Sequence, residues 1–213
     1  MGKGADTRER ILEIAECSVL AKGFAATSIE EIISEAGLTK SGFFYHFSDK
    51  SELAHAMLRR YIDTHDREFD EMFGRAAELS DDPLQVLLIG LKFMAESLAA
   101  GHPGCILTSI CYQERLFDRE TVALTGEVVR RWNARFRRYL AEIEAVHPLA
   151  VPVDLDDVAD MLTCVVDGAI IMAKTLNDPS RLERQVLAYR AYVRLLFSAG
   201  ASVNPRPAAI AAE

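Results

Sequence analysis

Apolar residues recur at helical spacing along almost the whole chain, and no segment alternates convincingly at the two-residue period of a β-strand. Glycine and proline interrupt the pattern, most strongly at Gly101-His102-Pro103-Gly104. The pattern therefore predicts an all-α fold, with the polar stretch 78–82 as a hinge between the N-terminal helices and the rest. We expect helices at about 7–22, 28–36, 39–47, 49–73, 84–98, 105–117, 121–146, 154–176 and 180–197.

The composition narrows the class of protein. Half of the 213 residues are apolar, which allows a sizeable core, but no apolar run approaches the roughly 18 residues of a membrane span. The start of the chain is polar and lacks the apolar stretch of a secretory signal, so we expect a cytoplasmic protein without membrane contact. The four cysteines and five histidines show no metal-ligand or disulfide spacing. We therefore expect free thiols, no metal and no cofactor.

The charge is unevenly distributed. The chain carries a net charge of −8 at pH 7, which argues against non-specific coating of nucleic acid. Residues 1–62 hold eight Lys and Arg against nine Asp and Glu, so this part is close to neutral and the remainder is acidic. A small DNA-reading surface on an acidic body remains compatible with these numbers, because only the local patch must face phosphate.

Two short helices on either side of Gly37 form the most informative local pattern. Ser28 and Glu31 have the spacing of a capping box at the start of the first, and Gly37 stands where a left-handed residue ends it. Thr39 can cap the second, which is very short. Two short helices joined by a few residues with a glycine, behind a supporting helix, are the helix-turn-helix layout. The spacing alone also fits a plain helical hairpin with an exposed aromatic rim.

The second short helix is expected to have two different faces. Phe43 and Phe47 are four residues apart and would lock it onto its neighbours, whereas Ser41 and Tyr45 lie on the opposite side. The small outward face lets the backbone approach the floor of a DNA major groove, where Lys40 and short hydroxyls can meet base edges. Other polar groups are placed to meet phosphates. The predicted DNA-binding residues are Thr27, Ser28, Thr39, Lys40, Ser41, Gly42, Tyr45, His46 and Lys50.

Several motifs between residue 7 and about residue 58 resemble the DNA-binding domain of the TetR (tetracycline-repressor-like) family. In order, they are Thr7-Arg8-Glu9-Arg10-Ile11-Leu12, Gly23-Phe24 with Thr27-Ser28-Ile29, Ala36-Gly37-Leu38, and Phe43-Phe44-Tyr45-His46-Phe47 followed by Lys50 and Leu53.

The resemblance implies a DNA-reading motif at 28–47, an all-α ligand-binding body and a dimer on a pseudo-palindromic operator. By matching positions, it places Thr39, Lys40, Ser41, Gly42 and Tyr45 in the groove and Thr27, Ser28, His46 and Lys50 on phosphates. It divides the chain into a helix-turn-helix domain at 1–58, a ligand-binding and dimerisation domain at 59–198, and a disordered tail at 199–213. The family often has Lys-Gly followed by a small residue where this chain has Lys40-Ser41-Gly42. The operator sequence therefore cannot be transferred.

The second domain is expected to hold a pocket for a small-molecule effector, again from the resemblance. Cys105, Thr108 and Tyr112 share one face of the helix that follows the Gly-Pro-Gly break. Together with Phe93, they could line an apolar pocket with a few polar points, although plain core packing explains each of them equally well. The predicted ligand or sensor residues are Met94, Cys105, Thr108, Tyr112, Trp132 and Phe136.

Cys105 also permits a sharper hypothesis. It lies at a predicted helix N-terminus, where the macrodipole would lower the thiol pKa and favour a reactive thiolate. The Gly104-Cys105 start of this helix resembles TetR-like regulators that respond to oxidants or electrophiles. The alternative is a buried, inert cysteine.

The last two predicted helices carry broad apolar faces that resemble the four-helix dimer interface of the family. Gly168 and Ala169 would permit close helix crossing there. Asp167 interrupts the apolar run and could bind a ligand, pair across the dimer interface or meet a neighbouring arginine. The apolar faces are formed by Val158, Leu162, Val165 and Ala169 and by Leu182, Val186, Val193 and Leu196.

Taken together, these patterns predict a ligand-responsive DNA-binding regulator, a repressor released from its operator by a small molecule or an electrophile. The alternative is an all-α ligand- or partner-binding protein that no longer reads DNA. An enzyme is not expected, since no Ser/His/Asp grouping, phosphate loop or metal spacing is present.

Overall fold

The computed structural model describes residues 3–99 and 104–198, and within these ranges it contains helices and no β-strand. The expected all-α fold class is confirmed. The helices are α1 (Lys3–Lys22), α2 (Ile29–Ala36), α3 (Lys40–Phe44), α4 (Lys50–Leu79), α5 (Pro83–Ala99), α6 (Ile106–Tyr112), the 3-10 turn η1 (Glu114–Leu116), α7 (Arg119–Glu144), α8 (Leu155–Thr175) and α9 (Ser180–Leu196).

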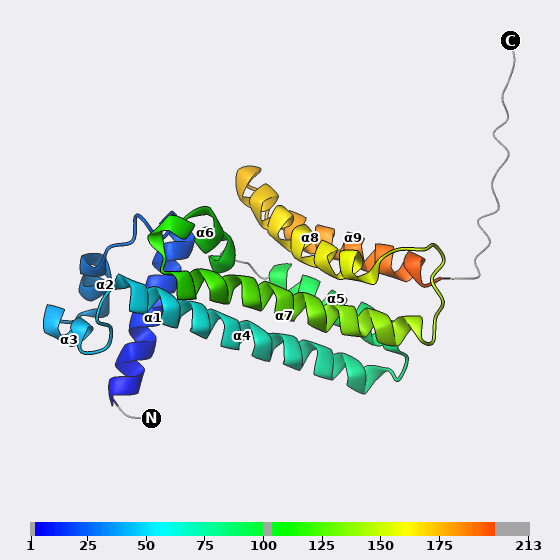
Figure 1. Cartoon of the computed structure of the whole chain (residues 1–213), viewed down its shortest axis with the longest axis horizontal. Coiled ribbons are helices and arrows are strands. Elements are labelled where there is room, and N and C mark those ends of the chain that lie inside the picture. Colours follow the sequence, from blue (N-terminus) through cyan, green and yellow to red (C-terminus); the bar gives the residue numbers. More distant parts are fainter. Residues whose placement is uncertain (1–2, 100–103, 199–213) are drawn as a thin grey trace, which may run out of the picture.

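The molecule is elongated, with the short helices at one end (Figure 1). There, α1, α2, α3 and α6 gather together, while α4, α5, α7, α8 and α9 run along the length of the body (Figure 1). The 30-residue helix α4 belongs to both parts, because it starts beside α3 and ends at the far tip. At 1.5 Å per residue such a helix is about 45 Å long. It therefore connects the two ends of the molecule as one rigid rod.

Local sequence explains where the long helices begin. Asp49 caps α4 by accepting a hydrogen bond of 2.8 Å from the backbone N–H of Glu52. Asp118 and Asp154 cap α7 and α8 in the same manner, by accepting from Thr121 and Asp156. Each of these carboxylates also faces the positive end of a helix dipole.

Several predicted boundaries differ from the structure. Helix α4 runs to Leu79 instead of ending near Phe73, because Phe69, Phe73 and Ala76 continue one buried stripe. The residues after α4 only join it to α5 at the far tip, so the expected hinge at 78–82 does not lie between the N-terminal helices and the rest. Helix α6 ends at Tyr112 and is followed by η1, and α3 ends at Phe44.

Two large apolar clusters form most of the core, and a small third one lies between α8 and α9. The first combines residues of α1–α4 with Ile106 and Ile110 of α6 and Leu124 of α7, so the N-terminal helices share their core with the body. The second fills the body between α4, α5, α7, α8 and α9. Helix α4 passes residue 58 without interruption, and the domain boundary there stays a prediction. The predicted tail at 199–213 lies outside the described residues.

None of the helices in the described ranges combines the length and the apolarity that crossing a membrane requires.

Candidate nucleic-acid interface

Helix α2 is fixed at both ends by the residues that the sequence indicated. The backbone N–H of Glu31 donates to Ser28 Oγ over 3.1 Å, and the Ser28 N–H donates to Glu31 Oε2 over 3.2 Å. Both halves of the predicted capping box are thus formed. Gly37 ends the helix with φ at +64°, a left-handed conformation that favours glycine.

Helix α3 is anchored from beneath by two aromatic rings. Phe43 and Phe47 are fully buried, and their ring centroids lie 5.9 Å apart. Thr39 caps the helix, since its Oγ1 accepts from the Gly42 N–H over 3.1 Å. The hydroxyls of Thr39 and Ser41 are also 3.1 Å apart and share a hydrogen bond. The outward hydroxyls are therefore held in fixed positions.

The opposite face of α3 is open to solvent. Tyr45 is 84% exposed, and Lys40 and Ser41 are exposed as well. A Cβ at Gly42 would lie only 3.2 Å from Thr39 Oγ1, so a side chain there would crowd the capping hydroxyl. The expected division into a buried aromatic face and a slim polar face is confirmed. Which residues contact DNA stays a prediction.

Thr27 does not have the exposed position that we expected. It is only 2% exposed, its hydroxyl donates to the Gly23 carbonyl over 3.0 Å, and its backbone N–H donates to the Phe24 carbonyl. Its hydroxyl also lies 3.1 Å from the Ser18 hydroxyl. The polar groups of Thr27 stabilise the α1–α2 turn, and the prediction of a phosphate contact from its side chain is corrected.

Lys50 also points inward. Its Nζ donates to the Phe24 carbonyl over 2.8 Å and lies 4.4 Å from the centroid of the Phe24 ring. Burial lowers the pKa of this amine below its usual value. Lys50 therefore ties the start of α4 to the α1–α2 turn, and its role as a phosphate clamp stays a prediction. His46 is half-buried and packs edge-on against Tyr45, with ring centroids 5.1 Å apart.

Most cations near α2 and α3 already have partners. Lys22 forms an ion pair with Glu31 at 2.6 Å, and Arg10 donates to the Glu35 carbonyl at 3.5 Å. Arg8, which the sequence analysis did not select, stacks on Phe47 with its guanidinium carbon 4.9 Å from the ring centroid. Lys40 forms no ion pair with any described residue. The exposed face of α3 is thus only weakly basic.

Residues between α6 and α7 contact the α1–α2 turn. The backbone N–H of Ala25 donates to Gln113 Oε1 over 3.1 Å, and Phe117 packs on Phe24 with ring centroids 4.3 Å apart. Asp118 accepts a hydrogen bond from Ser51 of α4. These contacts have no local sequence signal, because each joins segments far apart in the chain.

Of the predicted effector residues, the structure brings Cys105 and Thr108 together with Asp167. Thr108 Oγ1 donates to Asp167 Oδ1 over 3.3 Å, and the Cys105 thiol interacts with both Asp167 and the buried Tyr61 hydroxyl. Burial raises the pKa of the Asp167 carboxyl. These residues form a half-buried polar cluster between α4, α6 and α8.

The remaining predicted effector residues lie elsewhere. Tyr112 is 77% exposed, which corrects its placement as a pocket residue. Trp132 donates through Nε1 to Asp66 Oδ1 over 3.0 Å. Phe136 packs edge-on against Phe69, and Met94 packs on the same body core. The sequence analysis therefore identified one local cluster and otherwise core or surface positions.

Of the two hypotheses for Cys105, the lowered thiol pKa is corrected and the alternative of a buried thiol is favoured. Burial raises the pKa of this thiol, and the nearby Asp167 carboxylate raises it further. Cys105 stands at the N-cap of α6, but that helix has only seven residues. Desolvation and a neighbouring negative charge outweigh the dipole of so short a helix. The thiol is therefore not activated in this conformation.

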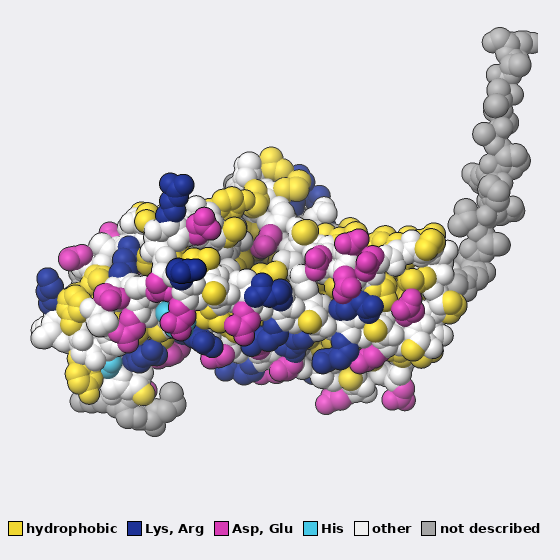
Figure 2. Space-filling view, viewed as in Figure 1, with side chains coloured by type: hydrophobic (Ala, Val, Ile, Leu, Met, Phe, Trp, Pro, Cys, Tyr) yellow, Lys and Arg dark blue, Asp and Glu magenta, His cyan; other side chains and the backbone are white. Residues whose placement is uncertain are grey.

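The apolar faces that we assigned to a dimer interface pack within the chain. Val158, Leu162 and Ala169 of α8 and Val186 and Val193 of α9 are all buried in the body. The outer surface of these helices carries other apolar residues, and hydrophobic side chains gather at the projecting end of α8 (Figure 2). The exposed apolar residues of α8 and α9 include Met161, Ile171, Met172 and Leu195, with Cys164 and Gly168 between them.

Comparisons with known proteins bear first on the N-terminal end. A family model described as "Bacterial regulatory proteins, tetR family" matches residues 11–57. The HTH-type transcriptional regulator TtgR of Pseudomonas putida is 37% identical over 81 residues, which make up 37% of this chain and 36% of TtgR. The match thus spans about a third of that relative. The transcriptional regulator AcuR of Cereibacter sphaeroides is 28% identical over 165 residues, or 76% of this chain and 73% of AcuR.

Solved structures share the fold over most of the chain. A TetR-family transcriptional regulator from Agrobacterium tumefaciens matches with a TM-score of 0.78 at 17% identity, covering 92% of this chain and all of that one. The reduced form of NemR from Escherichia coli matches with a TM-score of 0.72 at 20% identity, covering 87% of this chain and 96% of NemR. The likeness extends from the N-terminal helices through the helical body.

Proposed function

We propose that this chain, which belongs to the TetR family of bacterial regulatory proteins, is a ligand-responsive transcriptional regulator that binds operator DNA through α2 and α3. One observation carries the proposal: Phe43 and Phe47 hold α3 from below while Tyr45 stands 84% exposed above. A short helix that is locked in this way can enter a major groove without rearranging.

The structure refines the set of DNA contacts that we propose. Base edges would be met by the exposed slim face of α3, and phosphates by the N-terminus of α2 at Ser28, by His46 and by Arg8. Thr27 and Lys50 act indirectly, by fixing the turn that positions α2. The groove-facing residues are Thr39, Lys40, Ser41, Gly42 and Tyr45.

The proposed working unit is a homodimer formed through the outer faces of α8 and α9. Exposed Met161 and Ile171 flank Gly168, and a Cβ at Gly168 would meet nothing within 4 Å, so a partner helix can approach closely. A two-fold dimer presents two α3 helices, whose half-sites lie one DNA turn, about 10 base pairs, or a multiple of it apart.

The proposed regulation is release of a repressor from its operator by a small molecule or an electrophile. The cluster of Cys105, Thr108 and Asp167 supports a sensing role for the body, since half-buried polar groups are available there. The matched relatives are regulators, so we propose a binding protein in the cytoplasm and not an enzyme.

A gel-shift titration with the intergenic DNA beside the protein's own gene tests the proposal. Tyr45→Ala should weaken binding by about tenfold, the scale of one or two lost polar contacts. Tyr112→Ala is the matched control, because it removes an equally exposed tyrosine from α6. Both variants should unfold at the wild-type temperature. If Tyr45→Ala and wild type bound DNA with equal affinity, the proposal that α3 contacts the DNA bases would be contradicted.

The near-neutral charge of residues 1–62 favours the second candidate, a helical binding protein that no longer reads DNA. The ion pair of Lys22 and the inward position of Lys50 reduce the free positive charge further. Failure of the purified protein to shift any upstream fragment at low salt, where phosphate contacts are strongest, would favour this candidate.

A further inference from the structure

A groove between α4 and α5 has a chemistry that the DNA-binding surface does not use. It has a volume of about 360 Å³ and is lined by Glu68, Glu71, Met72 and Arg75 of α4 and by Phe93, Glu96 and Ser97 of α5. This volume lies at the lower end of the range of about 300–1,000 Å³ found for small-molecule sites. Of the residues that the sequence placed in a possible effector pocket, Phe93 lines this groove, whereas Met94, Cys105, Thr108, Tyr112, Trp132 and Phe136 do not.

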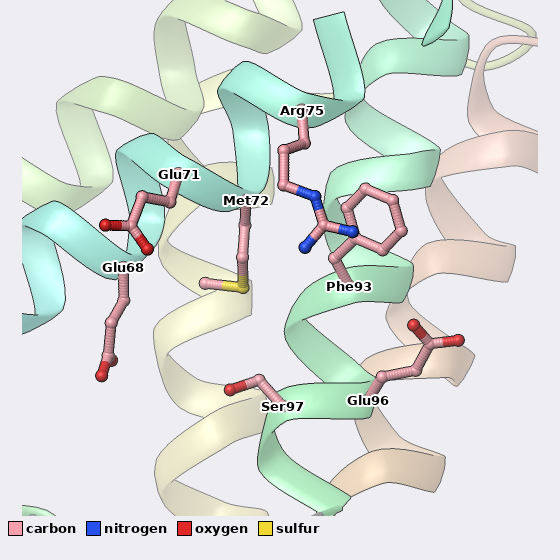
Figure 3. A pocket seen from close by; sticks show the side chains of 7 residues that line it. All are labelled: Glu68, Glu71, Met72, Arg75, Phe93, Glu96 and Ser97. Atoms are coloured by element: carbon pink, nitrogen blue, oxygen red, sulfur yellow. The ribbon is translucent and has the colours of Figure 1, made fainter. Parts of the chain in front are cut away.

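The groove combines an apolar floor with acidic walls (Figure 3). The Met72 thioether occupies the middle, Arg75 and Phe93 stand together on one side, and Glu68 and Glu71 lie on the other (Figure 3). Met72 packs on the body core beneath. A ligand would therefore find a polarizable surface in the centre and carboxylates along one edge.

The charge of the lining selects the sign of the ligand. Three carboxylates face one guanidinium, and that guanidinium is already stacked on Phe93, with its carbon 4.7 Å from the ring centroid. Glu68 contacts His65 at 3.0 Å and Glu96 contacts Lys92 at 3.3 Å, whereas Glu71 forms no ion pair with any described residue. An anion would be repelled, and a cation would gain a partner in Glu71.

The spacing of the carboxylates selects the kind of cation. Within the described residues no group of His, Cys, Asp and Glu side chains is arranged to hold a metal ion. The carboxylates are instead spread around Met72 and near an aromatic ring (Figure 3). An organic cation with an apolar body matches this arrangement, because its charge can face Glu71 and Glu68 while its body covers Met72.

We propose that this groove is the site of a small aromatic cation that acts as the effector. The effector role rests on the proposed regulatory function, whereas binding in the groove does not. The groove residues Met72 and Arg75 lie on α4. The N-terminal half of the same helix shares an apolar core with α1, α2 and α3. A ligand that spreads or tightens α4 against α5 therefore acts on the same rod that positions the DNA-reading end.

The binding test uses phenyltrimethylammonium and its uncharged isostere tert-butylbenzene, with the full-length protein and no DNA. The chain has six methionines, and the Met72 methyl signal is identified by its loss in Met72→Leu. Titration with the cation should shift the Met72 methyl resonance at concentrations near 1 mM, the affinity expected of a few contacts. The isostere should bind at least about threefold more weakly, because it cannot form the exposed ion pair with a carboxylate. Equal binding of both probes, or an unmoved Met72 signal, overturns the proposal.

Variants of opposite effect sharpen the test. Glu71→Gln should weaken binding of the cation about threefold, and Glu68→Gln combined with Glu71→Gln about tenfold. Arg75→Gln should strengthen it about threefold, because the resident cation leaves the ring. Glu78→Gln is the control, an exposed carboxylate of α4 outside the groove, and should change nothing. Weaker binding of the cation by Arg75→Gln would contradict the proposed site. A merely structural disturbance of the groove would weaken binding in Arg75→Gln and in Glu71→Gln alike.

A measurement of DNA affinity in the presence of the cation separates the proposed effector role from the proposed DNA-binding function. The cation should lower the affinity for operator DNA in wild type and about threefold less effectively in Glu71→Gln. Binding in the groove without any effect on DNA affinity overturns the effector role. A protein that shifts no DNA at all removes the proposed function, while the Met72 titration still decides whether the groove binds the cation.

Discussion

The two halves of α4 lie in contrasting surroundings. The first half shares an apolar core with α1, α2 and α3, in which Leu53, Ala54 and Met57 are almost fully buried. The second half borders the open groove at Glu71 and Arg75, with polar groups that lack strong partners. One helix therefore joins a well-packed end, which we propose reads DNA, to a body that has an open groove. A well-packed end can hold a helix in the position that a DNA groove requires, and an open groove in the body can admit a ligand.

The largest loss of stability should come from removing a buried ring at the proposed DNA-reading end. Phe47→Ala removes a fully buried ring and should lower the free energy of unfolding by about 3–5 kcal/mol. Phe44→Ala, at the end of α3 three residues earlier, removes a ring that is 41% exposed and should cost under about 1 kcal/mol. Urea unfolding followed by circular dichroism at fixed protein concentration measures both. Similar losses in the two variants would show that α3 is not anchored as described.

Overpacking the body should cost less. A Cβ at Gly90 of α5 would lie under 3.0 Å from three ring atoms of Phe73, so Gly90→Ala should destabilise the protein by about 1–3 kcal/mol. At Gly74 of α4 a Cβ meets nothing within 4 Å, and Gly74→Ala should stabilise by about 0.4–1 kcal/mol. The two alanines thus have opposite signs. A neutral Gly90→Ala would mean that α5 can move away from α4 without cost.

The junction between the two ends should show an intermediate effect. Lys50→Met keeps the aliphatic contact with Phe24 but loses the hydrogen bond to its carbonyl, at a cost of about 1 kcal/mol. The salt dependence of DNA binding should stay unchanged, because Lys50 points inward. If Lys50 were a phosphate clamp, the slope of log K against log salt would fall by about 1 in magnitude. Gel shifts at several salt concentrations distinguish the two roles.

The smallest effect concerns the polar cluster in the body. Burial raises the pKa of Asp167, so the folded state favours the protonated form, and the stability associated with it is lost as pH rises through the raised pKa. Asp167→Asn can still accept from Thr108 and should stabilise the protein at pH 7 by up to about 1 kcal/mol. Urea midpoints at acidic and neutral pH should differ less in the variant. An unchanged pH profile would contradict a desolvated carboxylate.

Sequence alone predicted the features that depend on neighbours within one helical turn. The capping box of Ser28 and Glu31, the left-handed Gly37 and the inward pair Phe43 and Phe47 all follow from local spacing. These features lie within the residues that the TetR family model matches, at the end that we propose reads DNA.

Features that depend on distant segments could not be predicted in this way. Lys50 was placed on phosphate because nothing nearby in the sequence shows that it reaches the Phe24 carbonyl, 26 residues earlier. Local sequence left open whether Cys105 is an activated or a buried thiol, because the burial and the Asp167 carboxylate that raise its pKa come from other helices. The groove depends on the relative placement of α4 and α5, for which the sequence carries no local signal.

Footprinting of the intergenic DNA beside the gene, with wild-type protein and Tyr45→Ala in parallel, tests the exposed face of α3 most directly. Wild type should protect a pseudo-palindromic site with half-sites one helical turn, about 10 base pairs, or a multiple of it apart. Tyr45→Ala should need about a tenfold higher concentration to protect the same site. An identical footprint from both proteins would contradict the assignment of DNA reading to α3.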